Sequence, residues 1–212
     1  MPDFNPELHR SLIQRRGEPI VWRRSHQCAC MNPVTRQQNP RCEVCDGIGY
    51  LYIETGEDLI ALVRQVDERQ QLMKYGQAMV GDITVTTMPD TARIGAGDMI
   101  ELTLRTFRYE ENIAASGETT DVLHYTRVGA LEYVASLETT YVVDTDCVLN
   151  PAGTGIIWLT TPPDAGVTLS IAYLRIPQYI VQPGAVATRR VIGGVQMPQR
   201  IAAKLLNRED FR

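Results

Sequence analysis

The middle of the chain is dominated by short runs in which β-branched and other apolar residues alternate with polar ones. Alternation with a period of two places the apolar side chains on one face of a strand. The clearest runs are residues 83–87, 99–107, 121–125, 130–137, 140–143, 155–159 and 167–174. Turn residues separate these runs, as at 95–98 and 162–166. The pattern predicts a mainly β protein whose body, residues 51–181, is a sandwich or a barrel.

One segment of this body fits two elements. In residues 58–74, Leu59, Leu62, Val63 and Val66 are spaced as on one face of a helix. Residues 59–63 equally suit a buried strand that continues the β pattern. Both interpretations stay open.

The N-terminal region, residues 1–50, is polar, rich in arginine and without a long hydrophobic period. A short helix is expected over residues 7–13, after Pro6. The β-like runs at 20–22 and 50–53 flank a group of cysteines and are expected to pair as a hairpin. Because the region has few apolar residues of its own, we interpret it as an extended arm that is placed against a neighbouring subunit.

The C-terminal region, residues 182–212, differs in composition from the body. Residues 182–184 (Gln-Pro-Gly) and the Gly pair at 193–194 are expected to break the β pattern. Pro198 then begins a short amphipathic helix with Ile201, Ala202, Leu205 and Leu206 on one face. The sequence therefore predicts three parts: an arm, a β body, and a tail with a short helix.

Four cysteines fall within eighteen residues, as a C-x-C pair and a C-x-x-C pair: Cys28, Cys30, Cys42 and Cys45. Two close pairs of soft thiolate ligands across a short loop are typical of a tetrahedral Zn²⁺ site. Gly47 and Gly49 follow the second pair and allow the backbone to turn under the metal. Since four thiolates complete the coordination sphere, the zinc is expected to be structural.

Other uses of the cysteines are disulfides, a redox pair or an iron–sulfur cluster. The N-terminus lacks the apolar segment of a secretory signal, which favours a reducing compartment and hence metal over disulfides. His26 is an alternative ligand, although a position beside the site or on the surface is favoured. Cys147 stands alone between Asp146 and Val148 and is expected to be a small core residue.

The net charge of −4 is unevenly distributed: residues 1–46 carry +2, residues 47–188 carry −10 and residues 189–212 carry +4. Basic ends and an acidic middle suit contacts between copies of the chain, although a solvated surface is the simpler interpretation. Four arginines precede or adjoin the cysteines: Arg15, Arg16, Arg23 and Arg24. They leave a zinc-stabilised nucleic-acid-binding module as an alternative function.

Catalytic chemistry is sparse in this sequence. There are three histidines, and the chain contains no H-E-x-x-H, G-x-S-x-G or Walker motif. We therefore expect no catalytic residues, no organic cofactor and no small-molecule substrate. Carboxylates distant in sequence can still meet in a fold, so an enzyme acting on a cell-surface polymer remains a third alternative. No apolar run approaches the roughly 18 residues of a membrane span, so no membrane partner is expected.

The order of features resembles that of small virion proteins of tailed bacteriophages, from the neck or head–tail junction. The residues that carry the resemblance are an arm with 17–22 (Gly-Glu-Pro-Ile-Val-Trp), the C-x-C pair, C-x-x-C-x-G-x-G-Tyr at 42–50, the β segments 162–173 and 177–181, and 197–204 near the end. The resemblance implies a structural head-completion protein of the neck or connector, or another tail or baseplate protein. It further implies a ring of identical copies, the portal or a tail component as neighbour, passive contact with packaged DNA, and assembly in the host bacterial cytoplasm into the virion.

Overall fold

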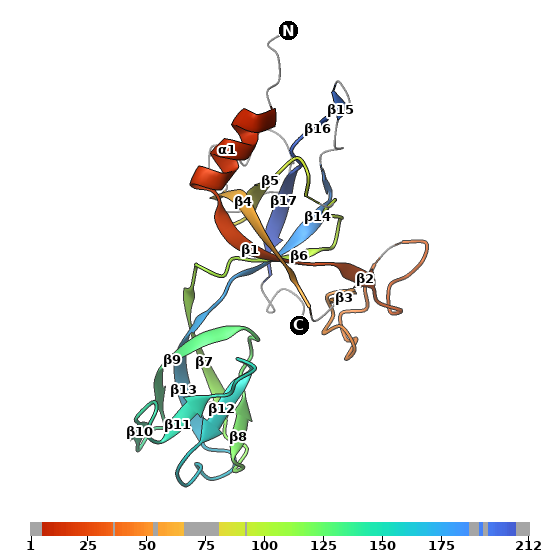
Figure 1. Ribbon diagram of the computed structural model, residues 1–212. Helices are drawn as coiled ribbons and strands as arrows, with labels where there is room; N and C mark the ends of the chain where they lie inside the picture. The colour runs from red at the N-terminus through yellow and green to blue at the C-terminus, as the bar shows by residue number, and fades with distance from the viewer. Residues whose placement is uncertain are drawn as a thin grey trace. The chain divides into compact units, whose positions relative to one another are not determined.

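The computed structural model describes residues 6–35, 37–52, 55–65, 81–91, 93–186, 191–192 and 195–206. These residues form a mainly β protein, as the sequence predicts, and they fall into two compact units. Unit 1 combines Met1–Leu104 with Gln178–Arg212, and unit 2 is Arg105–Pro177. Figure 1 shows the elements of both units.

Unit 1 is built on a closed six-stranded barrel with the strand order β1-β4-β5-β17-β14-β6, in which β6 pairs back to β1. A helix precedes the barrel, and two small hairpins, β2–β3 and β15–β16, accompany it. The bounds are α1 (Pro6–Arg16), β1 (Glu18–Arg23), β2 (Ser25–Gln27), β3 (Tyr50–Tyr52), β4 (Glu57–Gln65), β5 (Ile83–Thr87), β6 (Met99–Glu101), β14 (Gln178–Val186), β15 (Val191–Ile192), β16 (Val195–Gln196) and β17 (Arg200–Leu205).

The barrel encloses an apolar core to which its strands and the β5–β6 connection contribute. Its members are Ile20, Trp22, Ala61, Ile83, Val85, Ile94, Ile100, Leu102, Tyr179, Val181, Ile201 and Ala203. Because the sheet closes on itself, every barrel strand has a partner on both sides, which removes the exposed edges of an open sheet.

The first helix extends the predicted one and turns directly into the barrel. α1 buries Ile13, and the Gly17 N–H donates to the Ile13 carbonyl over 2.7 Å at its end. A Cβ on Gly17 would lie 2.7 Å from Ile60 Cγ2, so only glycine allows the helix end to approach β4 so closely.

The arm interpretation of residues 1–50 is wrong for residues 18–23, because β1 is a strand of the barrel between β4 and β6. The hairpin around the cysteines does form, but with a different first strand. β2 pairs with β3 through Ser25↔Tyr52 and Gln27↔Tyr50, whereas Trp22 faces Glu57 of β4. Ile20 and Trp22 are buried in the barrel core. Burial of their apolar side chains favours a place for β1 in the barrel over one in the hairpin.

The C-terminal helix predicted after Pro198 is also wrong, since residues 200–205 form β17. β17 fills the barrel between β14 and β5, and Ile201 and Ala203 point into the core. Tertiary pairing therefore decides the element in a segment whose apolar spacing suits a helix. The break predicted at 182–184 does not end β14, but the β14–β17 register shifts between Val181 and Val186.

The ambiguous segment at 58–74 is a strand as far as it is described, with β4 ending at Gln65; the rest lies outside the described residues. The alternation at 99–107 belongs to two strands, because β6 ends at Glu101 and the next strand begins at Phe107. The first segment of unit 1 ends between them, at Leu104. The β body expected over 51–181 is thus divided between the barrel and unit 2, so the predicted three-part boundaries differ from the observed units.

Unit 2 contains a four-stranded sheet, β10-β9-β13-β7, and a three-stranded sheet, β11-β12-β8. The bounds are β7 (Phe107–Ala114), β8 (Thr120–Val122), β9 (Val128–Ala135), β10 (Thr140–Tyr141), β11 (Cys147–Leu149), β12 (Gly155–Trp158) and β13 (Thr168–Arg175). Side chains from both sheets share one core, which includes Tyr173, Trp158 and the fully buried Cys147. Cys147 is a core residue, as predicted.

Candidate metal centre

The four-cysteine loop, residues 28–49, connects β2 to β3 and will be called the knuckle. It projects from the β2–β3 hairpin in Figure 1. The Cys28 N–H donates to the Gly49 carbonyl over 2.9 Å and extends the hairpin ladder by one step. The two cysteine pairs are thereby brought to the two ends of one closed loop.

The sulfurs of Cys28, Cys30, Cys42 and Cys45 all lie within 4.8 Å of one another. Cys28 and Cys42 are 3.8 Å apart at Sγ, and Cys30 and Cys45 are 3.5 Å apart. A metal–sulfur bond of about 2.3 Å places the corners of a sulfur tetrahedron about 3.8 Å apart. A disulfide needs about 2.05 Å, and all four cysteines are free thiols. The cluster therefore has the dimensions of a tetrahedral metal site.

Backbone N–H groups point at these sulfurs from the C-x-x-C turn. The N–H groups of Cys45 and Val44 bond to the Cys42 sulfur and lower the pKa of its thiol to about 7. The Gly49 N–H donates to Cys45 Sγ over 3.2 Å. Donors of this kind stabilise thiolates and orient them toward a metal.

Cys45 differs from Cys42 because it is buried. Burial is the largest cause that raises the pKa of the Cys45 thiol, to about 12, although the Gly49 N–H opposes it. Cys45 is thus held as a thiol in the metal-free protein, and a bound cation is the group that would remove its proton.

The turn depends on residues with positive φ. Asp46, Gly47 and Gly49 have φ of 50°, 75° and 82°. A Cβ on Gly49 would lie 2.7 Å from Met31 Sδ and 2.9 Å from Gln38 Cβ. The two glycines that follow the C-x-x-C pair in sequence therefore give the turn its conformation, and Gly49 also gives it space.

The knuckle is fixed to the barrel through Asp98, a buried carboxylate that the sequence marked only as part of a turn. Asp98 accepts hydrogen bonds from Trp22 Nε1 at 2.9 Å, from the Ser25 N–H at 2.9 Å and from the Gly95 N–H at 2.7 Å. Trp22 belongs to the barrel core and Ser25 opens the knuckle hairpin, so one side chain joins the two.

Tyr50 makes a second connection at the other end of the knuckle. Its ring lies directly on Gly97, where an added Cβ would be 2.4 Å from Tyr50 Cε1. Gly97 has φ of 86° and donates its N–H to the Val181 carbonyl of β14. Both ends of the metal loop are therefore packed on the same turn of the barrel.

A groove of about 900 Å³ borders the knuckle, with Cys28, Met31, Pro33 and Tyr50 among its lining residues. Among the described residues that line it, none is acidic, basic or a histidine. With four cysteines as the metal ligands, no ligand position is left for a substrate.

His26 and the four arginines Arg15, Arg16, Arg23 and Arg24 lie away from the sulfur cluster or apart from one another. His26 is exposed on β2 and is not among the residues that gather at the cluster. Arg23 is buried, with Nε 3.2 Å from Glu101 Oε1, and Arg24 pairs with Glu57 at 3.2 Å. Arg15 and Arg16 are exposed on α1. The structure therefore does not bring the four arginines together as one basic surface.

Unit 2 carries a buried polar cluster around Glu111. Tyr173 Oη and the His124 N–H both donate to Glu111 Oε1 over 2.9 Å. Burial, with the Glu111 charge adding to it, raises the pKa of the Tyr173 hydroxyl. The Arg175 guanidinium lies 3.9 Å from the centre of the Tyr125 ring. Glu111 thus provides an acceptor inside the unit for two donors, the Tyr173 hydroxyl and the His124 N–H.

The helix α1 has eleven residues and is too short to cross a bilayer. In the described part of the chain, no helix is both long enough and apolar enough to do so. Comparison of the sequence with models of known protein families and with curated proteins gives no match.

Proposed function

We propose that the knuckle binds one structural Zn²⁺ and that this protein is a structural component of a tailed-bacteriophage virion, in the neck or head–tail connector. The zinc holds the knuckle in one shape, and the chain acts by assembling with copies of itself and with a portal or tail component. The sequence resemblance described above is the support for the virion role.

The observation that carries the proposal is the closed four-sulfur cluster and its attachment to the barrel. All four sulfurs lie within 4.8 Å of one another, and both ends of the loop are fastened to the turn that holds Gly97 and Asp98. Four thiolates favour Zn²⁺ and leave no open coordination position, which is the pattern of structural sites. A metal that only shapes a surface loop suits an assembly protein better than an enzyme.

The knuckle carries two exposed apolar side chains that suit contact with another protein. Val34 and Val44 are 88% and 71% exposed. Val34 lies between the two cysteine pairs in sequence, and Val44 lies inside the C-x-x-C turn. Exposed apolar side chains on a stiffened loop are suited to contact with another protein.

The test has two measurements on protein purified under reducing conditions. Elemental analysis is expected to find one zinc per chain, and light scattering is expected to show multimers, alone or with portal or tail proteins from the same genome. Protein that binds no zinc would overturn the metal assignment. A zinc-loaded chain that stays monomeric with all of these partners would overturn the assembly role.

A further inference from the structure

One face of α1 is exposed and combines leucines with arginines. Leu8, Leu12, Arg15 and Arg16 lie within about 100° of one another around a helix of 3.6 residues per turn. Leu8 and Leu12 are 69% and 40% exposed, whereas Ile13 is buried. We call Leu8, Leu12, Arg15 and Arg16 the α1 stripe.

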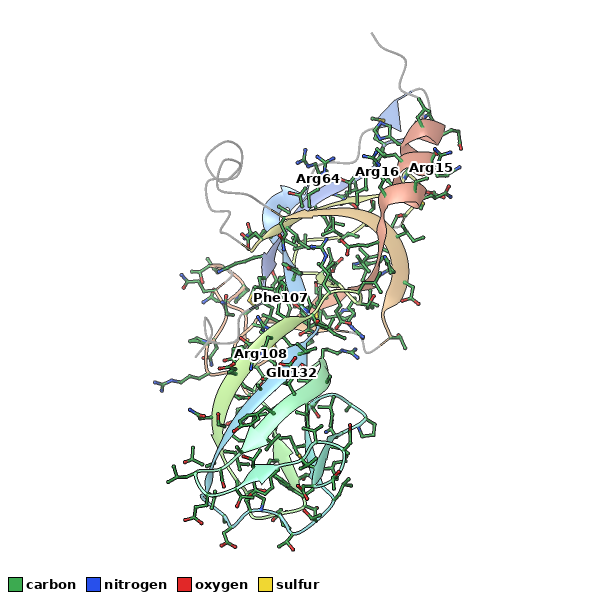
Figure 2. The ribbon with its side chains drawn as sticks, turned by 90° about the vertical axis from the view of Figure 1, so that its left-hand side faces the viewer. Arg15, Arg16, Arg64, Phe107, Arg108 and Glu132 are labelled. Carbon is green, nitrogen blue, oxygen red and sulfur yellow. The ribbon has the colours of Figure 1, made fainter. Side chains whose placement is uncertain are left out.

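Arg64 adds a third arginine beside the stripe. β1 and β4 pair through Glu18↔Ala61, so Arg64 lies three residues along β4 toward the end of α1. Figure 2 shows Arg15, Arg16 and Arg64 at the same end of the barrel. All three are exposed, and none forms an ion pair with another described residue. The stripe therefore combines apolar side chains with positive charges that no described acidic residue neutralises.

Unit 2 carries the opposite charge. Its residues 105–177 include four arginines, no lysine and nine acidic residues, a net charge of −5. Arg108 already engages Glu110 and Glu132, at 2.9 and 2.8 Å. The seven other acidic residues of unit 2 outnumber its three other arginines.

The β9–β10 hairpin and the residues after it combine acidic and apolar side chains. Leu137 is fully exposed at the turn and Val142 is 58% exposed after β10. Glu138 and Asp144 alternate with them and are exposed, and neither pairs with a described cation. We call Leu137, Glu138, Val142 and Asp144 the hairpin patch.

We propose that the α1 stripe of one copy docks on the hairpin patch of unit 2 in a second copy. This interface rests on the proposed assembly function and specifies how copies would meet. Leucines of the stripe would cover Leu137 and Val142, while the arginines would pair with Glu138 and Asp144. Because the two surfaces are different, the contact is head-to-tail and closes into a ring or continues as a filament.

The experiment is a charge exchange on the full, zinc-loaded chain. The helix variant is Arg15→Glu/Arg16→Glu, and the hairpin variant is Glu138→Arg/Asp144→Asn. Asparagine is chosen at position 144 because Asp144 has φ of 68°, which Asn tolerates. The control, Glu118→Arg/Asp164→Asn, makes the same charge change at two other exposed acidic residues of unit 2. Circular dichroism checks that each variant folds.

Sedimentation velocity at 50 mM salt measures self-association. We expect the helix and hairpin variants each to weaken it at least about tenfold, the control to leave it unchanged, and 500 mM salt to weaken the wild type. A mixture of the helix and hairpin variants is expected to associate again, because opposite charges then face each other. A misfolded variant cannot produce this rescue.

Three results would overturn the interface. The first is wild-type assembly that both variants retain, which leaves the proposed function intact. The second is loss without rescue in the mixture. The third is Arg15→Glu/Arg16→Glu abolishing binding to duplex DNA or to anionic phospholipid vesicles while self-association is unchanged, which would assign the stripe to those ligands. A wild type that never assembles, alone or with partners, would overturn the function as well.

Discussion

At the scale of single residues, the knuckle stabilises negative charge unequally on its thiols. Cys42 receives N–H groups from Cys45 and Val44, which lower its pKa to about 7. Cys45 is buried, and its pKa rises to about 12. A metal ion that needs all four thiolates must displace at least the Cys45 proton at neutral pH. Metal affinity is therefore coupled to pH.

Zinc affinity should rise with pH. Below pH 7 the Cys42 thiolate is lost, in addition to the proton already held by Cys45, so more protons must leave on binding. We expect the apparent Kd to fall by at least about two decades per pH unit between pH 6 and 7. Competition with a chromophoric chelator at several pH values measures this. An affinity independent of pH would mean that the thiols are not the ligands.

Serine substitutions should distinguish the metal-binding cysteines from the core cysteine, Cys147. Cys42→Ser is expected to lower zinc affinity by more than about 100-fold, since loss of even an outer-sphere partner costs 10- to 100-fold. Cys147→Ser should keep one zinc per chain but destabilise unit 2 by about 1–3 kcal/mol, because it buries a hydroxyl in an apolar core. Elemental analysis and denaturant unfolding distinguish the two. Zinc loss in Cys147→Ser would contradict the assignment.

Gly49 allows a matched test of space against backbone strain. Gly49 and Gly166 have φ of 82° and 87°, but an added Cβ meets Met31 and Gln38 at Gly49 and nothing within 4 Å at Gly166. Gly166→Ala should cost only the strain, about 1–2 kcal/mol. Gly49→Ala should cost more and also weaken zinc binding, as thermal unfolding and chelator competition would show. Equal effects on stability and no effect on zinc would argue against a tightly packed knuckle.

At the scale of elements, each unit contains a tryptophan whose indole N–H is held by a buried aspartate. Trp22 donates to Asp98 at 2.9 Å, and Trp158 donates to Asp121 at 2.7 Å. Asp98 also fixes Ser25 at the start of the knuckle, whereas Asp121 accepts the Ser116 N–H within unit 2. The two carboxylates are alike in burial and different in what they connect.

Alanine at these two positions should therefore have distinct effects. Asp98→Ala and Asp121→Ala each leave buried donors without an acceptor, at a cost of about 1–3 kcal/mol for each donor. Only Asp98→Ala should also weaken zinc binding, because it frees the first strand of the knuckle. Unfolding and chelator competition on both variants test this. Zinc binding that is equally affected by Asp121→Ala would show that the Asp98 connection is not specific.

The sequence predicted elements well where local pattern and tertiary pairing agree, as at residues 83–87 and 167–174. It failed at Arg200–Leu205, whose spacing suits a helix, because pairing to β5 and β14 is a long-range effect that no local window contains. The cysteine set was evident from spacing alone. Asp98 was not, since its role depends on Trp22 and Ser25, which are more than 70 residues away in sequence.

At the scale of the whole molecule, the two units have separate cores and each contains one of the two tryptophans. The metal site belongs to unit 1 and reaches its core through Asp98 and Trp22. The described core of unit 2 is made of side chains from residues 105–177 alone. Metal binding should therefore stabilise one unit and leave the other unchanged.

Single-tryptophan variants can report each unit separately. Trp158→Phe leaves Trp22 as the probe of unit 1, and Trp22→Phe leaves Trp158 as the probe of unit 2. Zinc at 100 times its Kd should stabilise unit 1 by about 2.7 kcal/mol, so a chelator should lower its unfolding midpoint in urea. The midpoint reported by Trp158 should not move. Equal shifts at both tryptophans would show instead that the two units unfold as one cooperative body, with the zinc supporting both.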